Sequence, residues 1–263
     1  MPARGGSAFG GNYIGVWTLI KKELVRFVRV PIQTIGSPVI TSLLYFAVFG
    51  AAVGSRIGDM NGLTYSEFIT PGLIMMNVIM VSFTGISSGI QLAKLLNTLN
   101  DILIAPFSNL EIIMGFSIAS VLRTMFTATL IYLVALFFIP FHITHFFYLL
   151  TFTALVAFFF SLLGIIIGVW SKDFEQIMVL PTFLITPLTF LGGVFYSTDM
   201  LPPMFKAISH WNPILYSING LRYGFYGVTD VSPFFAYMLF IVLTLATLAF
   251  AHHLFKIGYK IRT

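Results

Sequence analysis

The sequence predicts an all-α integral membrane protein with six transmembrane helices. Of its 263 residues, 58% are hydrophobic and only 9% are charged, whereas about 25% of the residues in a typical soluble domain are charged. The mean hydropathy is +0.95. The apolar runs are continuous and long enough for helices of about 20 residues, the length that spans a bilayer. They lack the alternation of apolar and polar residues that is typical of β-barrel strands.

An amphipathic helix is predicted before the first span, over residues 15–30, and Pro31 ends it. It is too charged to cross a bilayer, so residues 1–31 are expected to form a cytosolic interfacial helix with its basic face towards lipid headgroups and water. A solvated helix that packs on a partner is the alternative. The apolar face comprises Trp17, Ile20, Leu24, Phe27 and Val28, and the basic face Lys22, Arg26 and Arg29.

The six spans are expected at residues 34–53, 68–90, 112–139, 146–170, 177–195 and 234–254. Lys and Arg gather on one side of them, which predicts that this side and both termini are cytosolic. We find no soluble domain, so residues 1–263 are read as one membrane domain. The cytosolic set is Arg4, Lys21, Lys22, Arg26, Arg29, Lys94, Lys172, Lys256, Lys260 and Arg262, and the outer set is Arg56, Lys206 and Arg222.

Residues 196–230 are too polar to cross the bilayer and too apolar to form a solvated loop. Pro202 and Pro203 open one predicted short helix, and Pro213 interrupts the chain before the next. Such a segment belongs at the outer membrane interface. Its aromatic residues form either an ordinary interfacial belt or an exit that stacks on a lipid or sugar; the candidates for the exit are Phe195, Tyr196, Trp211 and Tyr216.

A cytosolic connection joins spans two and three at residues 94–111, and its pattern predicts a short amphipathic helix that Pro106 closes. Its apolar ridge either rests on the membrane surface or docks into a groove on a soluble partner. The apolar positions are Leu95, Leu96, Leu99, Ile102 and Leu103, and the polar positions are Lys94, Asn97, Thr98, Asn100 and Asp101.

Several blocks together resemble the permease subunit of type-2 ABC exporters, the ABC-2 membrane protein family, and particularly its YadH-like branch. They are YSEFITPGL, ILIAPFSN, DFEQIMVLPTFLITPLTFLGGVFYS and SHWNPILYSINGLRYGFYG, and the similarity runs from residue 14 to the C-terminus. The resemblance implies a six-helix half-transporter that pairs with a second copy and two ATPase subunits. It also implies short helices that dip back into the membrane from the outer side after span five.

The resemblance further implies that the N-terminal helix and residues 94–108 contact the ATPase. The coupling residues would be Lys94, Leu95, Leu99, Asp101, Ile102, Leu103 and Pro106. The family often carries more charges in this connection, whereas this chain offers Asp101 as its main acid.

Energy conversion is expected on another polypeptide, because the sequence contains no phosphate-binding loop G-x-x-x-x-G-K-[ST]. No cofactor is expected on this chain, and ATP and Mg would bind the partner. The chain would then be the transport subunit of an inner-membrane exporter for an amphiphilic, lipid-like, glycan or drug substrate. It is not expected to be an enzyme itself. The basic residues flank the spans and form no single basic face, so nucleic acid is not an expected partner.

Other motifs have structural interpretations. Residues 85–89 fit the hydrolase pattern G-x-S-x-G, but they lie inside a span and equally spell the helix-packing pattern G-x-x-x-G, as do Gly164 and Gly168. Arg123 falls in the middle of span three, where it either binds an anionic substrate or is satisfied by carbonyls and a neighbouring helix. His142 and His145 lack a third metal ligand nearby and are expected to cap the outer interface.

An ion-coupled secondary transporter or channel is the alternative function. Such carriers place carboxylates within their spans, whereas Glu67 and Glu111 lie near predicted span ends. The sequence therefore offers no evident proton or ion relay.

Overall fold

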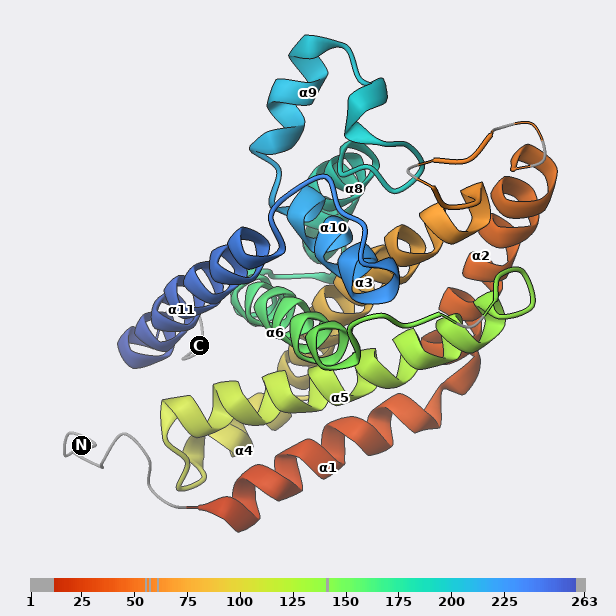
Figure 1. Ribbon diagram of the computed structural model, residues 1–263. Helices are drawn as coiled ribbons and strands as arrows, with labels where there is room; N and C mark the ends of the chain where they lie inside the picture. The colour runs from red at the N-terminus through yellow and green to blue at the C-terminus, as the bar shows by residue number, and fades with distance from the viewer. Residues whose placement is uncertain (1–11, 55, 57, 61, 141, 259–263) are drawn as a thin grey trace.

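The computed structural model describes residues 12–54, 56, 58–60, 62–140 and 142–258, without the side chains of residues 33, 51–53 and 103. Every regular element in these ranges is a helix (Figure 1). Arg4, Lys260 and Arg262, which contributed to the predicted orientation, lie outside the described residues. We call the two ends of the helical bundle the α4 end and the α9 end, after the short helices that they carry.

Five helical segments are long and apolar enough to cross a membrane. They are α3 (Tyr65–Leu95), α5 (Asn109–Ala135), α6 (Phe146–Trp170), residues Phe174–Leu191 and α11 (Pro233–Ile257). A sixth candidate is a pair of helices, residues 13–29 and 34–50, bent by 87°. The second arm of this pair coincides with predicted span one.

Spans one and five are irregular. Span one consists of the π-helical η1 (Ile32–Gly36), α2 (Ser37–Tyr45) and the π-helical η2 (Phe46–Val53). Span five consists of α7 (Phe174–Leu180), η3 (Pro181–Ile185) and α8 (Thr186–Leu191). Pro181 and Pro187 lie at the breaks in span five, because proline cannot donate the backbone hydrogen bond that a regular α-helix requires.

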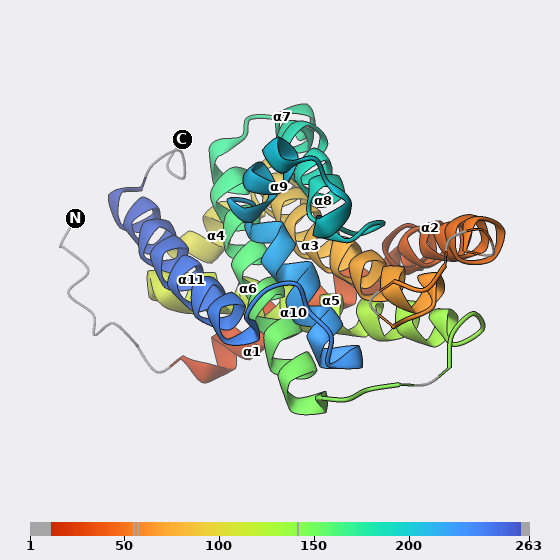
Figure 2. The ribbon, with the colours of Figure 1, turned by 45° about the horizontal axis from the view of Figure 1, so that its top comes forward.

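Helices α3 and α6 form the centre of the bundle (Figures 1 and 2). A Cβ atom on Gly168 would stand 3.1 Å from Cα of Ser87, and one on Gly164 would stand 3.3 Å from Cα of Phe83. These two glycines therefore let the helices approach closely, as the small-residue pattern predicts. One apolar cluster surrounds this contact towards the α9 end, and a second, around Ile90 and Phe116, lies towards the α4 end.

Helix α1 (Tyr13–Arg29) runs beside α5 and in the same direction (Figure 1). The backbone amide of Asn12 donates to Glu111 at 3.1 Å, and the Phe27 ring contacts the Phe126 ring at 6.3 Å between centroids. The buried face comprises Leu19, Ile20, Glu23 and Phe27. The predicted apolar face is therefore rotated: Trp17 and Val28 are exposed, and an acid lies on the buried side.

The prolines of the polar segment begin two helices, as predicted: α9 (Pro203–His210) and α10 (Pro213–Tyr226). They differ in burial. Helix α9 exposes most of its residues, whereas α10 packs against α3 and α6 with Leu215 and Ile218 fully buried (Figure 2). Helix α10 therefore belongs to the core of the bundle, and the position of the segment at the outer membrane interface stays a prediction.

Candidate functional site

The connection between α3 and α5 protrudes at the α4 end as a broken helix. Helix α3 continues to Leu95, and Asn97 then adopts a left-handed conformation with φ of 56° before α4 (Thr98–Ile104) begins. Asparagine tolerates this conformation better than most residues. The break separates the predicted apolar ridge into two parts with different environments.

The two parts of this ridge have different roles. Leu99 and Ile102 are buried in the apolar cluster at the α4 end, whereas Leu95, Leu96 and Ile104 are 60%, 63% and 78% exposed. Asp101 and Pro106 are exposed as well. The side chain of Leu103 lies outside the described residues. The surface open to a partner at this end therefore comprises Leu95, Leu96, Asp101, Ile104 and Pro106, together with the exposed amides Asn97 and Asn100.

Lys94 holds helices together. Its Nζ donates to the carbonyl oxygen of Ser171 at 3.0 Å and to that of Val169, at the C-terminal end of α6. A cation there compensates the carbonyl groups that have no partner within the helix. The Gln91 amide donates to the carbonyl of Lys172 at 2.6 Å. The connection is thereby fixed to the end of α6.

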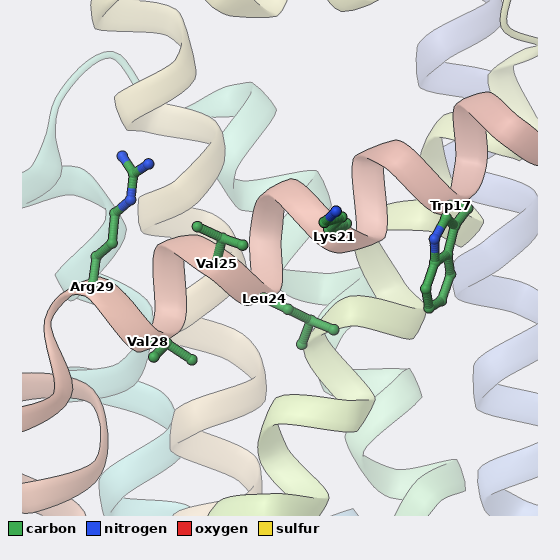
Figure 3. Close-up of a pocket in the computed structure, with 6 residues that line it drawn as sticks. All are labelled: Trp17, Lys21, Leu24, Val25, Val28 and Arg29. Carbon is green, nitrogen blue, oxygen red and sulfur yellow. The ribbon is translucent and has the colours of Figure 1, made fainter.

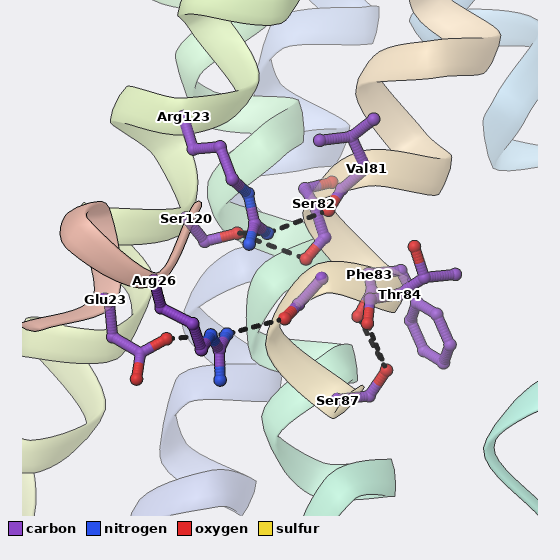
Figure 4. Close-up of polar contacts among 10 residues, drawn as sticks. Glu23, Arg26, Val81, Ser82, Phe83, Thr84, Ser87, Ser120 and Arg123 are labelled. Atoms are coloured by element: carbon purple, nitrogen blue, oxygen red, sulfur yellow. Dashed lines mark hydrogen bonds and ion pairs between the residues drawn. The ribbon is translucent and has the colours of Figure 1, made fainter. Parts of the chain in front are cut away.

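Arg123 lies in a polar cluster between α3, α5 and α1 (Figure 4). Its guanidinium donates to the carbonyl oxygen of Val81 at 3.0 Å and lies within 3.5 Å of the Ser120 hydroxyl, and the side chain is 8% exposed. The Phe27 ring centroid is 5.8 Å from the guanidinium carbon. Of the two predicted roles, this environment favours satisfaction by a neighbouring carbonyl and helix.

Arg26 reaches the same helix from α1 (Figure 4). It donates to the carbonyl oxygen of Gly85 at 3.1 Å and forms an ion pair of 2.7 Å with Glu23. A buried acid and an α3 carbonyl thus hold part of the Arg26 guanidinium inward, while its side chain stays 26% exposed at the edge of α1. Lys22 and Arg29 are exposed, as expected.

Gly85 and Gly89 accommodate these two guanidinium groups. A Cβ on Gly85 would stand 2.0 Å from Nη2 of Arg123, and one on Gly89 would stand 2.2 Å from the guanidinium of Arg26. The pattern G-x-x-x-G was predicted as a helix-packing face. Here it admits arginine side chains from two neighbouring helices, whereas Gly164 and Gly168 provide the direct helix contact.

The predicted exit residues are distributed over several contacts at the α9 end. Phe195 packs between Tyr45, Phe49 and Phe190, with ring centroids 4.6 to 5.9 Å apart. The Tyr196 hydroxyl donates to the carbonyl of Phe190 at 2.8 Å. Phe195 and its partners thus link span five to span one.

Trp211 and Tyr216 lie apart from this cluster. Trp211 is 90% exposed, and the Tyr216 hydroxyl donates to the His210 carbonyl at 2.9 Å while its ring contacts Phe235. Among the described residues, no hydrogen bond, ion pair or ring contact joins either of them, or the Phe195 group, to Arg123. The structure therefore does not gather the five predicted path residues into one site.

Arg222 holds α10 in the core and was not singled out from the sequence. The side chain is fully buried, and its guanidinium carbon lies 3.8 Å from the Phe68 ring centroid. It donates to the Gly193 carbonyl at 3.0 Å and to Oδ1 of Asn219 at 3.2 Å, and Asn219 also accepts from the backbone amide of Asp230 at 3.1 Å. This network joins α10 to α3 and to the turn after α8.

The two predicted outer histidines stack on aromatic rings. His142 lies 5.6 Å from Tyr226 and His145 lies 4.6 Å from Tyr223, centroid to centroid. Backbone hydrogen bonds from Thr144 and His145 to the end of α10 hold this loop in place. Within the described ranges no group of three potential ligands could hold a metal ion.

One side of α1 carries an apolar stripe, Trp17, Leu24 and Val28, with Lys21 and Arg29 beside it (Figure 3). Trp17, Leu24 and Val28 line a shallow hollow together with Val25, Lys21 and Arg29. A water-facing helix has little reason to expose such a stripe. The stripe therefore indicates contact with lipid or with another protein.

Comparison with known proteins identifies the family. Residues 15–226 match the family described as ABC-2 type transporter. The chain belongs to the ABC-2 type transporter family. It is 45% identical over 219 residues to the inner membrane transport permease YadH of Escherichia coli K12, covering 82% of this chain and 86% of that protein. Nodulation protein J of Rhizobium leguminosarum biovar viciae is 23% identical over 216 residues, covering 82% of both chains. Nodulation protein J of Rhizobium meliloti strain 1021 is 24% identical over 216 residues, covering 82% of this chain and 81% of the relative.

Membership confirms the family inferred from the sequence blocks. An ABC-2 permease is the membrane subunit of an ABC transporter and works with an ABC ATPase. Together with the apolar helices, the likeness to an inner membrane permease makes this chain a multi-pass inner-membrane protein. Sequence reasoning did not predict the buried contacts of Arg222, Glu23 and Arg26, because nothing in their spacing distinguishes a charge held inside the bundle from one at its surface.

Proposed function

We propose that this chain is one of two identical membrane subunits of an ATP-driven exporter, each paired with a separate ATPase subunit that binds ATP and Mg. Both termini and the α4 end face the cytosol, and the α9 end faces outward. The observation that carries the proposal is the α4 connection: it presents an exposed apolar and acidic surface on a short helix that is anchored firmly to the spans. Such a helix can transmit motion of a soluble partner.

The coupling surface is narrower than the sequence indicated. Leu95, Asp101, Ile104 and Pro106 contact the ATPase, because they are exposed members of the connection. Leu96 is exposed as well but lines a groove beside α1. Leu99 and Ile102 pass the motion inward through the apolar cluster that they share with α3 and α5. Lys94 ties the same connection to α6 through carbonyl groups. A movement of α4 would thus be transmitted to α3, α5 and α6.

Spans one and five are the surfaces on which the second copy is proposed to pack. Only 22% of residues 174–191 of span five are buried. In span one, Ile40, Leu44 and Val48 are 51% to 59% exposed. Phe195 joins these two spans at the α9 end. The substrate path would then run between the copies, and its apolar walls favour an amphiphilic, lipid-like, glycan or drug cargo.

The carboxylates near the spans have structural roles, which does not support ion coupling. Glu67 and Glu111 complete capping boxes with Thr64 and Ser108 at the starts of α3 and α5. Glu23 is paired with Arg26. In the ranges that the structure describes, the buried carboxylates are Glu23 and Glu111, and both are engaged in these contacts.

Purification from the native membrane, without crosslinking, tests this assembly. Native mass spectrometry is expected to find two copies of the chain with two copies of an ABC ATPase. Asp101→Arg with Ile104→Asp should release the ATPase, whereas Met204→Asp, an equally exposed apolar position on α9, should leave the complex intact. Recovery of the chain alone, together with flux driven by an ion gradient in the absence of ATPase, would contradict the proposal.

A further inference from the structure

The basic side of α1 borders a groove that the contacts above do not fill. The groove has a volume of about 520 Å³ and lies between α1 and the last turns of α3. Its walls carry Lys21, Lys22, Arg26 and Arg29 on one side and the exposed side chains of Leu92 and Leu96 on the other. It is thus both cationic and apolar.

The charge of this groove is strongly one-sided. Four basic residues face one acid, Glu23, so the lining carries four minus one, or three, net positive charges. Among the described residues, Glu23 forms its ion pair with Arg26. Lys22 and Arg29 have no ion pair in the same part of the chain and are exposed. An anionic occupant matches this charge.

An apolar hollow continues from the groove around α1 (Figure 3). It has a volume of about 360 Å³ and shares Lys21, Val25 and Arg29 with the groove. Trp17, Leu24 and Val28 complete its lining, and Trp17 and Val28 are 63% and 64% exposed. A single amphiphile can therefore place an anionic group in the groove and a hydrocarbon chain on the stripe beside it.

The length of α3 places the groove at the edge of the bilayer. A hydrocarbon core of about 30 Å takes up roughly 20 residues of a helix. Span two is predicted to end at Ile90 on the cytosolic side. Leu92 and Leu96, which line the groove, then fall in the headgroup region just beyond it. This placement relies on the proposed orientation and not on transport activity.

We propose that an anionic phospholipid of the cytosolic leaflet binds in this groove. Its phosphate lies among Lys22, Arg26 and Arg29, and one acyl chain lies along Trp17 and Val28. The bound lipid would fill the space between α1 and α3 that the Arg26 contact leaves open, and so would hold α1 at its place beside α5.

Quenching of Trp17 fluorescence tests the site directly. The sequence has three tryptophans, so Trp170→Phe with Trp211→Phe leaves Trp17 as the reporter in the full-length protein. The protein is reconstituted in phosphatidylcholine vesicles. A small fraction of a lipid with brominated acyl chains is then added, either brominated phosphatidylglycerol or brominated phosphatidylcholine. Brominated phosphatidylglycerol is expected to quench Trp17 at a much lower fraction than brominated phosphatidylcholine. Equal quenching by the two lipids would overturn the proposal.

Charge variants test the role of the basic wall. Lys22→Gln with Arg29→Gln should lower the apparent affinity for brominated phosphatidylglycerol roughly tenfold or more, since each basic residue near an anionic surface contributes about fivefold. Lys256→Gln, an exposed lysine at the end of α11, should leave it unchanged. Arg26 is retained so that α1 stays attached, and size-exclusion chromatography verifies the fold. If the double variant instead releases the ATPase and keeps its lipid quenching, the groove is a protein contact and the proposal fails.

Discussion

Two arginines from neighbouring helices meet α3 one turn apart, and they differ in their freedom to move. Arg123 is 8% exposed and is enclosed by α3, α5 and Phe27, whereas the side chain of Arg26 is 26% exposed at the edge of α1. Each lies over a glycine of α3. The glycines should therefore respond differently to an added methyl group.

Gly85→Ala is expected to destabilise the protein by about 1–3 kcal/mol, the usual cost of overpacking, because the enclosed Arg123 guanidinium has no space to retreat. Gly89→Ala should cost less than Gly85→Ala, since Arg26 can swing outward and the helix preference of alanine, up to about 1 kcal/mol, offsets part of the contacts that Arg26 loses with Gly85 and Glu23. Gly36→Ala, whose Cβ would meet no heavy atom closer than 3.9 Å, is the control. Thermal unfolding in detergent measures all three. Equal Tm values for the two α3 variants would contradict this assignment.

Arg222→Met is expected to cost about 3 kcal/mol, because it leaves the buried Gly193 carbonyl without its charged donor. Protease cleavage between α8 and α10 should increase with the loss of Tm. Arg222→Lys should recover only part of the stability, since an ammonium lacks the planar fork that stacks on Phe68 and reaches two acceptors. A full recovery with lysine would show that charge alone matters.

Lys206→Met provides a comparison for Arg222 in the same outer segment. In the native protein, the hydrogen bond and the charge of Lys206 hold the pKa of Asp199 below its usual range. Because this pKa is lowered on folding, the ion pair stabilises the fold at pH values above the pKa that Asp199 has in the unfolded chain. The stabilisation is lost as the pH falls through the pKa of Asp199 in the folded protein. Because the Asp199 side chain is 73% exposed, solvent screens the pair, and no change in Tm is expected at neutral pH. A large decrease in Tm for Lys206→Met would contradict this prediction and show that the pair stabilises the fold.

At the scale of elements, the connection at the α4 end separates anchoring residues from contact residues. Asp101→Arg and Ile104→Asp should abolish ATPase coupling while Tm stays constant, because both side chains are exposed. Leu99→Asp should lower Tm sharply, because it buries a carboxylate in an apolar cluster. The measurements are thermal unfolding of the chain and ATPase activity of the reconstituted complex. An exposed variant that unfolds the chain would contradict this division.

Sequence patterns predicted the helical elements well and their surroundings less well. Continuous apolar runs located the spans, and prolines located the starts of α9 and α10, because both signals act locally. Periodicity could not show that Asn97 breaks the α4 connection, that Glu23 lies on the buried face of α1, or that α10 enters the core. These outcomes depend on contacts between residues far apart in the chain, such as Arg26 with Gly85 and Arg222 with Phe68.

The proposed orientation places the two ends of the helical bundle on opposite sides of the membrane. The sequence contains no cysteine, so single cysteines report topology without background. Arg56→Cys should react with a membrane-impermeant maleimide in intact cells, and Lys172→Cys should react only after the membrane is opened. Both native residues are exposed. The reverse labelling pattern would invert the orientation and remove the α4 connection from the cytosol.

In the proposed exporter, ATP drives relative motion of two copies of this chain through the α4 connection. The most direct test is electron-paramagnetic distance measurement between spin labels on Asn100→Cys, an exposed position of α4, in the reconstituted complex with its ATPase. One label per chain should give a single distance between the copies without nucleotide and a clearly different one when ATP is trapped with vanadate. Absence of any distance between labels, or the same distribution in both states, would contradict the claim.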